Sequence, residues 1–183
     1  CWTPEWAEAR ALLREELSTL PVEVEQDEAG NLWAYLKGQT AKTVVVGSHL
    51  DSVPAGGWLD GALGVMGGLE VLRSLAAAPT PPQRSFALVD WADEEGARFS
   101  RSLFGSAAVV GTLDIEILRG LKDRNGMALP EVVAEYGVSI DHLDGCRTRL
   151  ENVVAYLELH IAQGPVLEHE GLGTGLVPGP AGT

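Results

Sequence analysis

The sequence has few cysteines, few basic residues and no apolar run long enough to cross a membrane. Only Cys1 and Cys146 occur among 183 residues, which excludes a disulfide framework, and neither has the neighbours of a structural zinc site. Lys and Arg number 13 against 26 Asp and Glu, a formal charge of -13, so nucleic acid and anionic membranes are poor partners. With no secretory signal visible, the expected location is the cytoplasm.

The remaining composition, 45% hydrophobic and 21% charged residues, is typical of one globular domain. Hydrophobic patterning predicts an α/β fold with a mixed, largely parallel sheet flanked by helices. Strands are expected at 22–26, 32–36, 43–46, 85–91 and 153–161, and helices at 4–19, 61–77, 102–110, 114–122 and 130–136. The first two strands predict a hairpin, and the strand–helix–strand order that follows predicts a parallel, right-handed βαβ unit.

The stretch 43–51 contains the first two candidate site residues. The strand expected at 43–46 runs into Gly47-Ser48, and the next side chain is His49, with Asp51 two positions later. Ligands in open α/β sheets bind beyond the carboxyl ends of strands, so His49 stands where a metal ligand is expected. A metal-bound imidazole commonly gives its other N–H to a carboxylate, which makes Asp51 the predicted orienter. The alternative is an ordinary loop histidine.

Asp60 lies at the end of a loop rich in glycine and proline. These residues allow the loop to fold back and bring Asp60 near His49. The apolar spacing after Gly61 predicts a helix, so Asp60 also stands where a carboxylate is favoured at a helix start. From this stretch alone, Asp60 is either a second metal ligand or a helix cap.

An acidic run follows the strand expected at 85–91. Its four carboxylates are Asp90, Asp93, Glu94 and Glu95. A solvated loop is the commoner explanation of such a run. Here the run is expected at the same sheet edge as His49 and Asp60, where converging carboxylates are costly unless a cation compensates them. Of two adjacent glutamates, one can bind a metal while the other moves protons.

The third apolar run, at 153–161, ends in a histidine. Its alternation places His160 on the same face as Glu158 at the end of the expected strand. A lone histidine at a strand end is more often structural, but this strand would deliver a nitrogen ligand to the edge already described. The predicted ligand set is therefore His49, Asp60, Glu95 and His160.

The other two histidines are interpreted as structural. His142 lies in a short polar segment and is expected at the surface. His169 lies in the last turn of a short helix that Gly171 ends, where the helix dipole favours a histidine. The tail at 173–183, rich in glycine and proline and with a brief extended run at 174–177, is expected to be a linker.

Three long motifs resemble a known family. The residues are Gly47-Ser48-His49-Leu50-Asp51-Ser52-Val53 with Gly56-Gly57-Trp58-Leu59-Asp60-Gly61, then Asp93-Glu94-Glu95-Gly96 with Arg98-Phe99, then Glu158-Leu159-His160-Ile161 with Gln163-Gly164-Pro165. They resemble the N-carbamoyl-L-amino-acid hydrolase, allantoate amidohydrolase and β-ureidopropionase family. These proteins are dinuclear metal amidohydrolases, similar in fold to aminoacylases and carboxypeptidase-like zinc metallopeptidases. The resemblance runs from near Pro4 to near Pro180.

The resemblance implies two divalent ions, of Zn, Mn, Co or Ni, and a role for each site residue. The implied metal ligands are His49, Asp60, Glu95 and His160, with Asp60 bridging the two ions. Glu94 resembles the general base, Asp51 the orienter of His49, and Gln163 a contact of the small-molecule substrate. The implied reaction is hydrolysis of a carbamoyl or ureido C–N bond, with Glu94 passing a proton from water to the departing nitrogen.

Two departures from the family pattern qualify this expectation. Ala162 stands where the family usually has glutamate, which removes a carboxylate beside the ligand His160. Family members also continue into a lid and dimerisation domain and then return to complete the site. The resemblance therefore implies that 1–172 is the first segment of a catalytic domain, that 173–183 leads toward the lid, that this chain alone has low activity, and that the full-length protein is a homodimer.

Two further functions stay open. One is a related metallo-aminopeptidase, dipeptidase or deacylase; a histidine at position 160 favours the carbamoyl hydrolases instead. The other is a metal-binding or interaction domain without catalysis, which Ala162 and the missing second half favour, while Glu94 favours activity. Dinucleotide binding is disfavoured, because the glycines after Asp60 do not form G-x-G-x-x-G.

Overall fold

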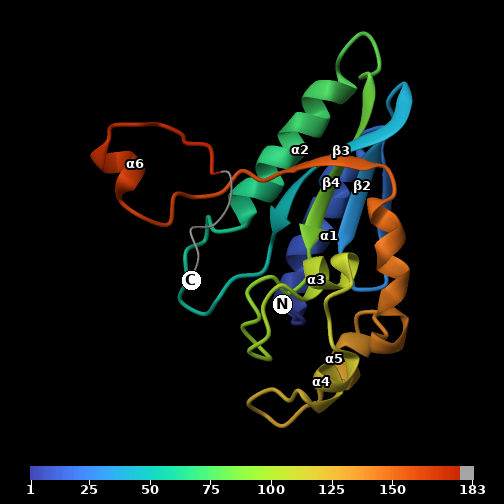
Figure 1. Cartoon of the computed structure of the whole chain (residues 1–183), viewed down its shortest axis with the longest axis vertical. Helices are drawn as coiled ribbons and strands as arrows, with labels where there is room; N and C mark the ends of the chain where they lie inside the picture. Colours follow the sequence, from blue (N-terminus) through green and yellow to red (C-terminus); the bar gives the residue numbers. More distant parts are fainter. Residues whose placement is uncertain (178–183) are drawn as a thin grey trace.

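The protein, described here by a computed structural model over residues 1–177, is an α/β sandwich (Figure 1). In chain order its elements are α1 (Pro4–Ser18), β1 (Glu23–Gln26), β2 (Leu32–Leu36), β3 (Thr40–His49), α2 (Ala62–Ala76), β4 (Arg84–Trp91), α3 (Phe104–Val110), α4 (Ile115–Gly120), α5 (Leu129–Ala134), the 3-10 helix η1 (Ile140–Leu150), β5 (Val153–Leu157) and α6 (Val166–His169). None of the helices within this range is long and apolar enough to span a bilayer.

The five strands form one mixed sheet in the order β1-β2-β4-β3-β5. β1 and β2 form the predicted hairpin, and β2 pairs antiparallel with β4. β3 and β4 are parallel neighbours joined by α2, which confirms the predicted βαβ unit. β5 pairs parallel with β3 on the far side. The two parallel pairings therefore bring the carboxyl ends of β3, β4 and β5 to one edge.

The sheet separates two apolar cores. On one face α1 and α2 cover alternate residues of β2 and β4, including Leu32, Leu36 and Leu88. On the other face Trp33, Val45 and the remaining alternate positions belong to a second core, which includes residues of α3, α4, α5 and η1 and also Trp6 of α1. This arrangement follows from side chains that point to opposite faces along a strand. The mixed sheet flanked by helices is thus confirmed.

Glycines on α2 bring this helix close to β3 and β4. A Cβ on Gly64 would lie 2.5 Å from Ser48 Cβ, and one on Gly68 would lie 2.5 Å from Leu88 Cδ1. Larger residues would push the helix away from the sheet. The close packing holds the start of α2, and therefore Asp60, beside the end of β3.

Some element boundaries differ from those expected. β3 runs from Thr40 to His49, so the histidine is the last residue of the strand rather than part of a loop. The strand expected at 153–161 ends at Leu157, so His160 lies beyond it and that expectation was wrong. The 3-10 helix Ile140–Leu150, which contains exposed His142, was not predicted as an element.

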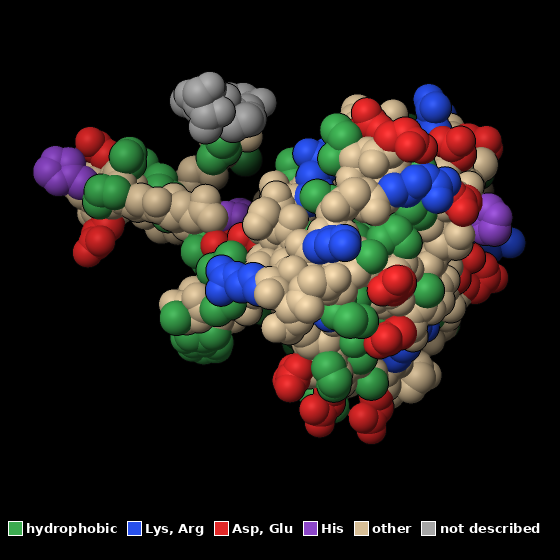
Figure 2. Space-filling view, turned by 90° about the horizontal axis from the view of Figure 1, so that it is seen from below, with side chains coloured by type: hydrophobic (Ala, Val, Ile, Leu, Met, Phe, Trp, Pro, Cys, Tyr) green, Lys and Arg blue, Asp and Glu red, His purple; other side chains and the backbone are tan. Residues whose placement is uncertain are grey.

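The end of the described chain stands apart from the body of the molecule. β5 is an edge strand with Val154, Tyr156 and Leu157 at least 42% exposed. Figures 1 and 2 both show the segment around α6 projecting away from the sheet and its helices. Residues 173–177 contain no helix or strand, and the rest of the expected linker, 178–183, lies outside the described residues.

Candidate metal centre

His49 is buried at the carboxyl end of β3, with its side chain 3% exposed. Its Nδ1 lies 2.8 Å from the backbone carbonyl oxygen of Asp51 and 3.7 Å from that residue's carboxylate. The predicted orienter therefore acts through its main chain, because the short turn after β3 brings the carbonyl, not the carboxylate, onto the ring. When Nδ1 carries the proton and donates it to this carbonyl, Nε2 has a free lone pair. Nε2 can then accept a hydrogen bond or bind a cation.

The Asp51 carboxylate has a different partner. Its two oxygens accept the backbone N–H groups of Glu94 at 3.2 Å and of Glu95 at 3.1 Å. Asp51 is buried, so these bonds join the end of β3 to the loop after β4 in an environment with little water. Asp51 thereby fixes the backbone of both predicted glutamates, a role that the sequence did not indicate.

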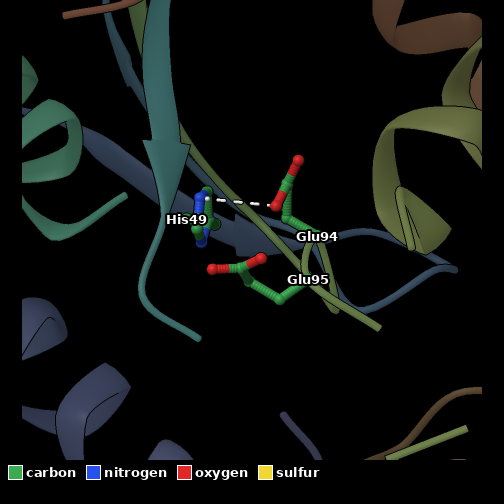
Figure 3. A group of neighbouring side chains, drawn as sticks. All are labelled: His49, Glu94 and Glu95. Atoms are coloured by element: carbon green, nitrogen blue, oxygen red, sulfur yellow. Dashed lines mark ion pairs between the residues drawn. The ribbon is translucent and has the colours of Figure 1, made fainter. Parts of the chain in front are cut away.

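The two glutamates approach the imidazole from one side (Figure 3). His49 Nε2 lies 3.5 Å from Glu94 Oε2. One nitrogen of His49 and one oxygen each of Glu94 and Glu95 lie within 4.8 Å of one another, the only such set of three or more His, Cys, Asp and Glu side chains within residues 1–177. Carboxylates and an imidazole at this separation can share one cation.

The charges of this cluster shift the proton affinities of its members. Burial lowers the pKa of His49, but the Asp51 carbonyl and the carboxylates of Asp51, Glu94 and Glu95 outweigh burial, so its pKa lies above the ordinary value. Burial raises the pKa of Glu94; His49 opposes this rise, and Glu95 and Asp51 add to it. A carboxyl with a raised pKa is suited to accepting and returning a proton near neutral pH.

The other two carboxylates of the acidic run turn inward, so the expectation that all four converge was wrong. Asp90 is fully buried and pairs with Arg10 at 2.6 Å. Asp93, also buried, accepts a hydrogen bond from Trp2 Nε1 at 3.0 Å. Alternation along β4 and the left-handed backbone of Asp93, with φ of 53°, direct these two side chains away from the cluster. Their partners lie more than 75 residues away in sequence, so no local pattern reveals them.

Asp60 belongs to a second group with His160 and Gln163. His160 Nε2 lies 3.2 Å from Asp60 Oδ1, and Gln163 Nε2 donates to Asp60 Oδ2 at 3.0 Å. Gln163, predicted as a substrate contact, is thus bonded to a predicted ligand. The N-cap of α2 is Gly61, with no side-chain capping bond, so Asp60 is not the helix cap that the sequence left open.

Gly61 joins the two groups. A Cβ on Gly61, whose φ is 69°, would lie 2.4 Å from His49 Nδ1 and Cε1. The backbone beside Asp60 therefore packs against the imidazole, as the folded-back loop predicted. Asp60 and His160 nevertheless lie outside the compact set of His49, Glu94 and Glu95.

The donor atoms fit divalent cations. Asp60 Oδ1 is buried and accepts no hydrogen bond within the described residues, although His160 Nε2 lies close to it. A buried carboxylate oxygen without a partner is costly, and a cation would satisfy it. Histidine nitrogens and carboxylate oxygens suit zinc, manganese, cobalt or nickel. The geometry therefore offers one donor group around His49 and another around Asp60.

A chain of hydrogen bonds behind the site was not predicted. Glu158 accepts from Ser48 Oγ at 2.6 Å and pairs with the Tyr156 hydroxyl at 2.8 Å, while Trp91 Nε1 donates to the same hydroxyl at 2.9 Å. The chain connects the ends of β3, β4 and β5. The only sequence signal was the shared face of Glu158 and His160.

An apolar hollow of about 340 Å³ adjoins the site. Its lining includes Trp33, Trp91, Val110 and Tyr156, and it reaches Glu94 and Glu158 at its polar end. Glu94 is therefore shared between the hollow and the cluster around His49.

The fold places histidine and carboxylate donors at the carboxyl edge of an α/β sheet. Residues 31–123 match peptidase family M28. The chain belongs to this family, and the resemblance to the hydantoinase/carbamoylase amidohydrolases that the motifs predicted is confirmed.

Named relatives agree with this assignment. An N-carbamoyl-L-amino acid amidohydrolase from Geobacillus stearothermophilus is 40% identical over 99% of this chain and 44% of its own length. An allantoate amidohydrolase from Bacillus subtilis is 32% identical over the same shares. The crystal structure of a hydantoinase/carbamoylase family amidase from Burkholderia vietnamiensis matches with a TM-score of 0.80 and 35% identity, over 93% of this chain and 41% of that one. The chain thus spans less than half the length of these relatives.

Proposed function

We propose that this protein is a metal-dependent amidohydrolase that cleaves the carbamoyl or ureido C–N bond of N-carbamoyl-L-amino acids or allantoate-like ureido acids. The observation that carries the proposal is the set of His49, Glu94 and Glu95, whose donor atoms lie within 4.8 Å of one another at the carboxyl edge of the sheet. Relatives named N-carbamoyl-L-amino acid and allantoate amidohydrolases support the substrate class.

We assign the metal-binding roles from the motifs, because the contacts alone leave Asp60 and His160 outside the set of His49, Glu94 and Glu95. His49, Asp60 and His160 would hold one divalent ion, and Asp60 and Glu95 a second. Such ions supply a water of lowered pKa and positive charge opposite the developing oxyanion. Gln163, which donates to Asp60, would orient that carboxylate and, as the motifs imply, contact substrate.

Glu94 is the proposed general base. Its carboxylate accepts a proton from the attacking water and returns it to the departing nitrogen. Burial raises its pKa, so that it holds the proton between these two events. Asp51 keeps Glu94 in place through the Glu94 backbone N–H. The products are ammonia, carbon dioxide and an amino acid or related acid.

The match to a peptidase family favours one second candidate, hydrolysis of a peptide bond. The same donor groups suit both reactions, because each passes through a tetrahedral oxyanion. The substrate therefore separates the two candidates.

The test is an assay of the purified protein with zinc, manganese, cobalt or nickel on three substrates: an N-carbamoyl-L-amino acid, allantoate and a dipeptide. Release of ammonia from either of the first two, abolished by chelation and by Glu94→Gln, supports the proposal. Glu170→Gln, at an exposed position in the projecting segment, is the matched control and keeps activity. Cleavage of the dipeptide alone favours the peptidase, and zinc binding without turnover of any substrate favours a domain that binds metal only.

Four expectations remain predictions. These are a cytoplasmic location, low activity of this chain alone, a linker at 173–183, and a homodimer in the full-length protein. Analytical ultracentrifugation tests the homodimer, and limited proteolysis, with first cleavage after residue 172, tests the linker.

A further inference from the structure

The end of β3 is held by a buried ion pair that the proposed chemistry does not use. Arg10 of α1 donates from Nε to Asp90 Oδ2 at 2.6 Å and from Nη2 to the Asp90 carbonyl at 3.2 Å. Arg10 Nη1 donates to the Gly30 carbonyl at 2.6 Å. The two side chains are 6% and 0% exposed. A buried pair of this kind contributes little to stability compared with an apolar pair of similar size, so its position calls for another explanation.

The second oxygen of Asp90 reaches the metal-binding segment. Asp90 Oδ1 accepts the backbone N–H of Leu50 at 2.9 Å. The pairing of β3 with β4 ends at His49 and Trp91, so Leu50 is the first residue beyond the ladder. The Asp90 side chain therefore continues the hydrogen bonding of β4 to β3 by one residue, between His49 and Asp51.

The geometry points to Asp90, held by Arg10, as a positioning residue that fixes the Leu50 N–H and thereby aims His49 at the metal site. This inference rests on the proposed function, because it assigns a role toward the ion that His49 would hold. Three contacts restrain the segment: Asp90 holds Leu50, the Asp51 carbonyl holds the His49 ring, and the Asp51 carboxylate holds the Glu94 and Glu95 backbones. All three contacts involve residues 49–51, so loss of the first is expected to loosen the other two.

Arg10 provides hydrogen-bond donors that the buried Asp90 side chain needs. A carboxylate in a dry interior needs a cation and several donors, and Arg10 provides two bonds to this residue. Its guanidinium is itself fixed by the Gly30 carbonyl and by the Trp6 ring, whose centroid lies 4.4 Å away. Because Arg10 bonds to Oδ2 and to the carbonyl oxygen of Asp90, Oδ1 is available to accept the Leu50 N–H.

The test compares two double variants that remove the ion pair equally. Arg10→Met with Asp90→Asn keeps a side-chain oxygen for the Leu50 N–H, whereas Arg10→Met with Asp90→Leu removes it. If Asp90 positions His49, the leucine variant loses about 10- to 100-fold in zinc affinity, the usual range for outer partners of a metal ligand. The asparagine variant keeps its affinity and the visible spectrum of the cobalt-loaded protein.

A purely structural role predicts the opposite pattern. Both variants would then change the free energy of unfolding and neither would change zinc affinity or the cobalt spectrum, which would overturn the inference. Asp27→Asn is the control: Asp27 is buried and holds the turn before β2, and its carboxylate accepts from Ala29, Asn31 and Trp33 rather than from 49–51. It is expected to lower stability without changing zinc affinity.

A second measurement needs no metal. Amide hydrogen exchange at Leu50 and the tautomer of His49, read by NMR, should differ between the two double variants, with loss of protection and a mixed tautomer only in the leucine variant. Equal protection of Leu50 in both variants refutes the inference. If the unmodified protein binds no zinc, the proposed function fails, while this comparison still decides the role of Asp90 in placing His49.

Discussion

The two donor groups of the site differ in how firmly the fold holds them. In the first group the His49 side chain is 3% exposed and that of Glu94 29%; the Asp51 carbonyl holds the His49 ring, and the Asp51 carboxylate holds the Glu94 backbone. His160 and Asp60 are 36% and 19% exposed. The first group lies between paired strands, whereas His160 lies beyond the edge strand β5. Buried backbone bonds thus preorganise one group, and the other depends on side-chain contacts.

This difference bears on which residues matter for metal affinity and which for the fold. A buried ligand whose ring is held by a carbonyl loses little freedom when it binds an ion. An exposed ligand loses more side-chain entropy on binding. The four experiments below test this contrast, from the largest expected effect to the smallest.

His49→Ala should have the largest effect. It removes the buried nitrogen nearest to Glu94 and Glu95, so zinc affinity should fall by more than about 100-fold, beyond the range seen for outer partners. Calorimetric titration measures the loss. His169→Ala, on the projecting α6, is the histidine control and should bind as the unmodified protein does. Equal affinity of the two variants would exclude His49 as a ligand.

Asp51→Ala should weaken both metal binding and the fold. The change leaves the N–H groups of Glu94 and Glu95 without their acceptor, at a cost of about 1–3 kcal/mol for each buried group. Zinc affinity should fall by about 10- to 100-fold, because both glutamates lose their support. Urea unfolding and zinc titration measure the two effects. An unchanged midpoint of unfolding would show that these bonds contribute nothing.

Asp93→Asn should stabilise the metal-free protein at neutral pH. Burial, then the charge of Asp51, raises the pKa of Asp93 from 3.8 to about 6, against the hydrogen bond from Trp2. A raised acid pKa means that its contribution to stability is present below about pH 4 and is lost as pH rises through about 6.

The gain for Asp93→Asn at pH 7 is at most about 3 kcal/mol, since one pKa unit corresponds to about 1.4 kcal/mol. Unfolding with urea between pH 4 and pH 7, in the presence of a chelator, measures it. Asparagine also suits the left-handed backbone at this position, but that effect does not depend on pH. A gain of the same size at pH 4 and pH 7 would assign it to the backbone instead.

His160→Ala should have the smallest effect on the fold. His160 is exposed, so the free energy of unfolding should change by less than about 0.5 kcal/mol. Zinc binding should weaken, because the ion assigned to His49, Asp60 and His160 loses one of its three ligands. A loss of stability similar to that of Asp51→Ala would show that the two groups are equally built into the fold.

Local patterns predicted the elements that carry the site. The β-branched residues at 43–46, the apolar spacing after Gly61 and the apolar run at 85–91 have the strand and helix periods that burial imposes. The hairpin and the βαβ unit follow from them. The end of β5 was not predictable from its period, because the alternation continues to His160 while pairing with β3 stops at Leu157.

The contacts within the site were less predictable. Proximity of His49, Glu94 and Glu95 follows from strand ends that meet at one edge. That Asp51 would bond to glutamate backbones, and that Asp90 and Asp93 would turn to Arg10 and Trp2, depends on residues far apart in the chain.

The sequence by itself determined which residue types stand at the strand ends, because hydrophobic periodicity and short motifs are local properties of the chain. Only the tertiary structure decided which carboxylates face the imidazole, which are buried in ion pairs or hydrogen bonds, and how firmly each donor is held. The physical reason is that burial and backbone hydrogen bonding between distant segments set both orientation and charge, and neither is encoded in the spacing of residues along the chain.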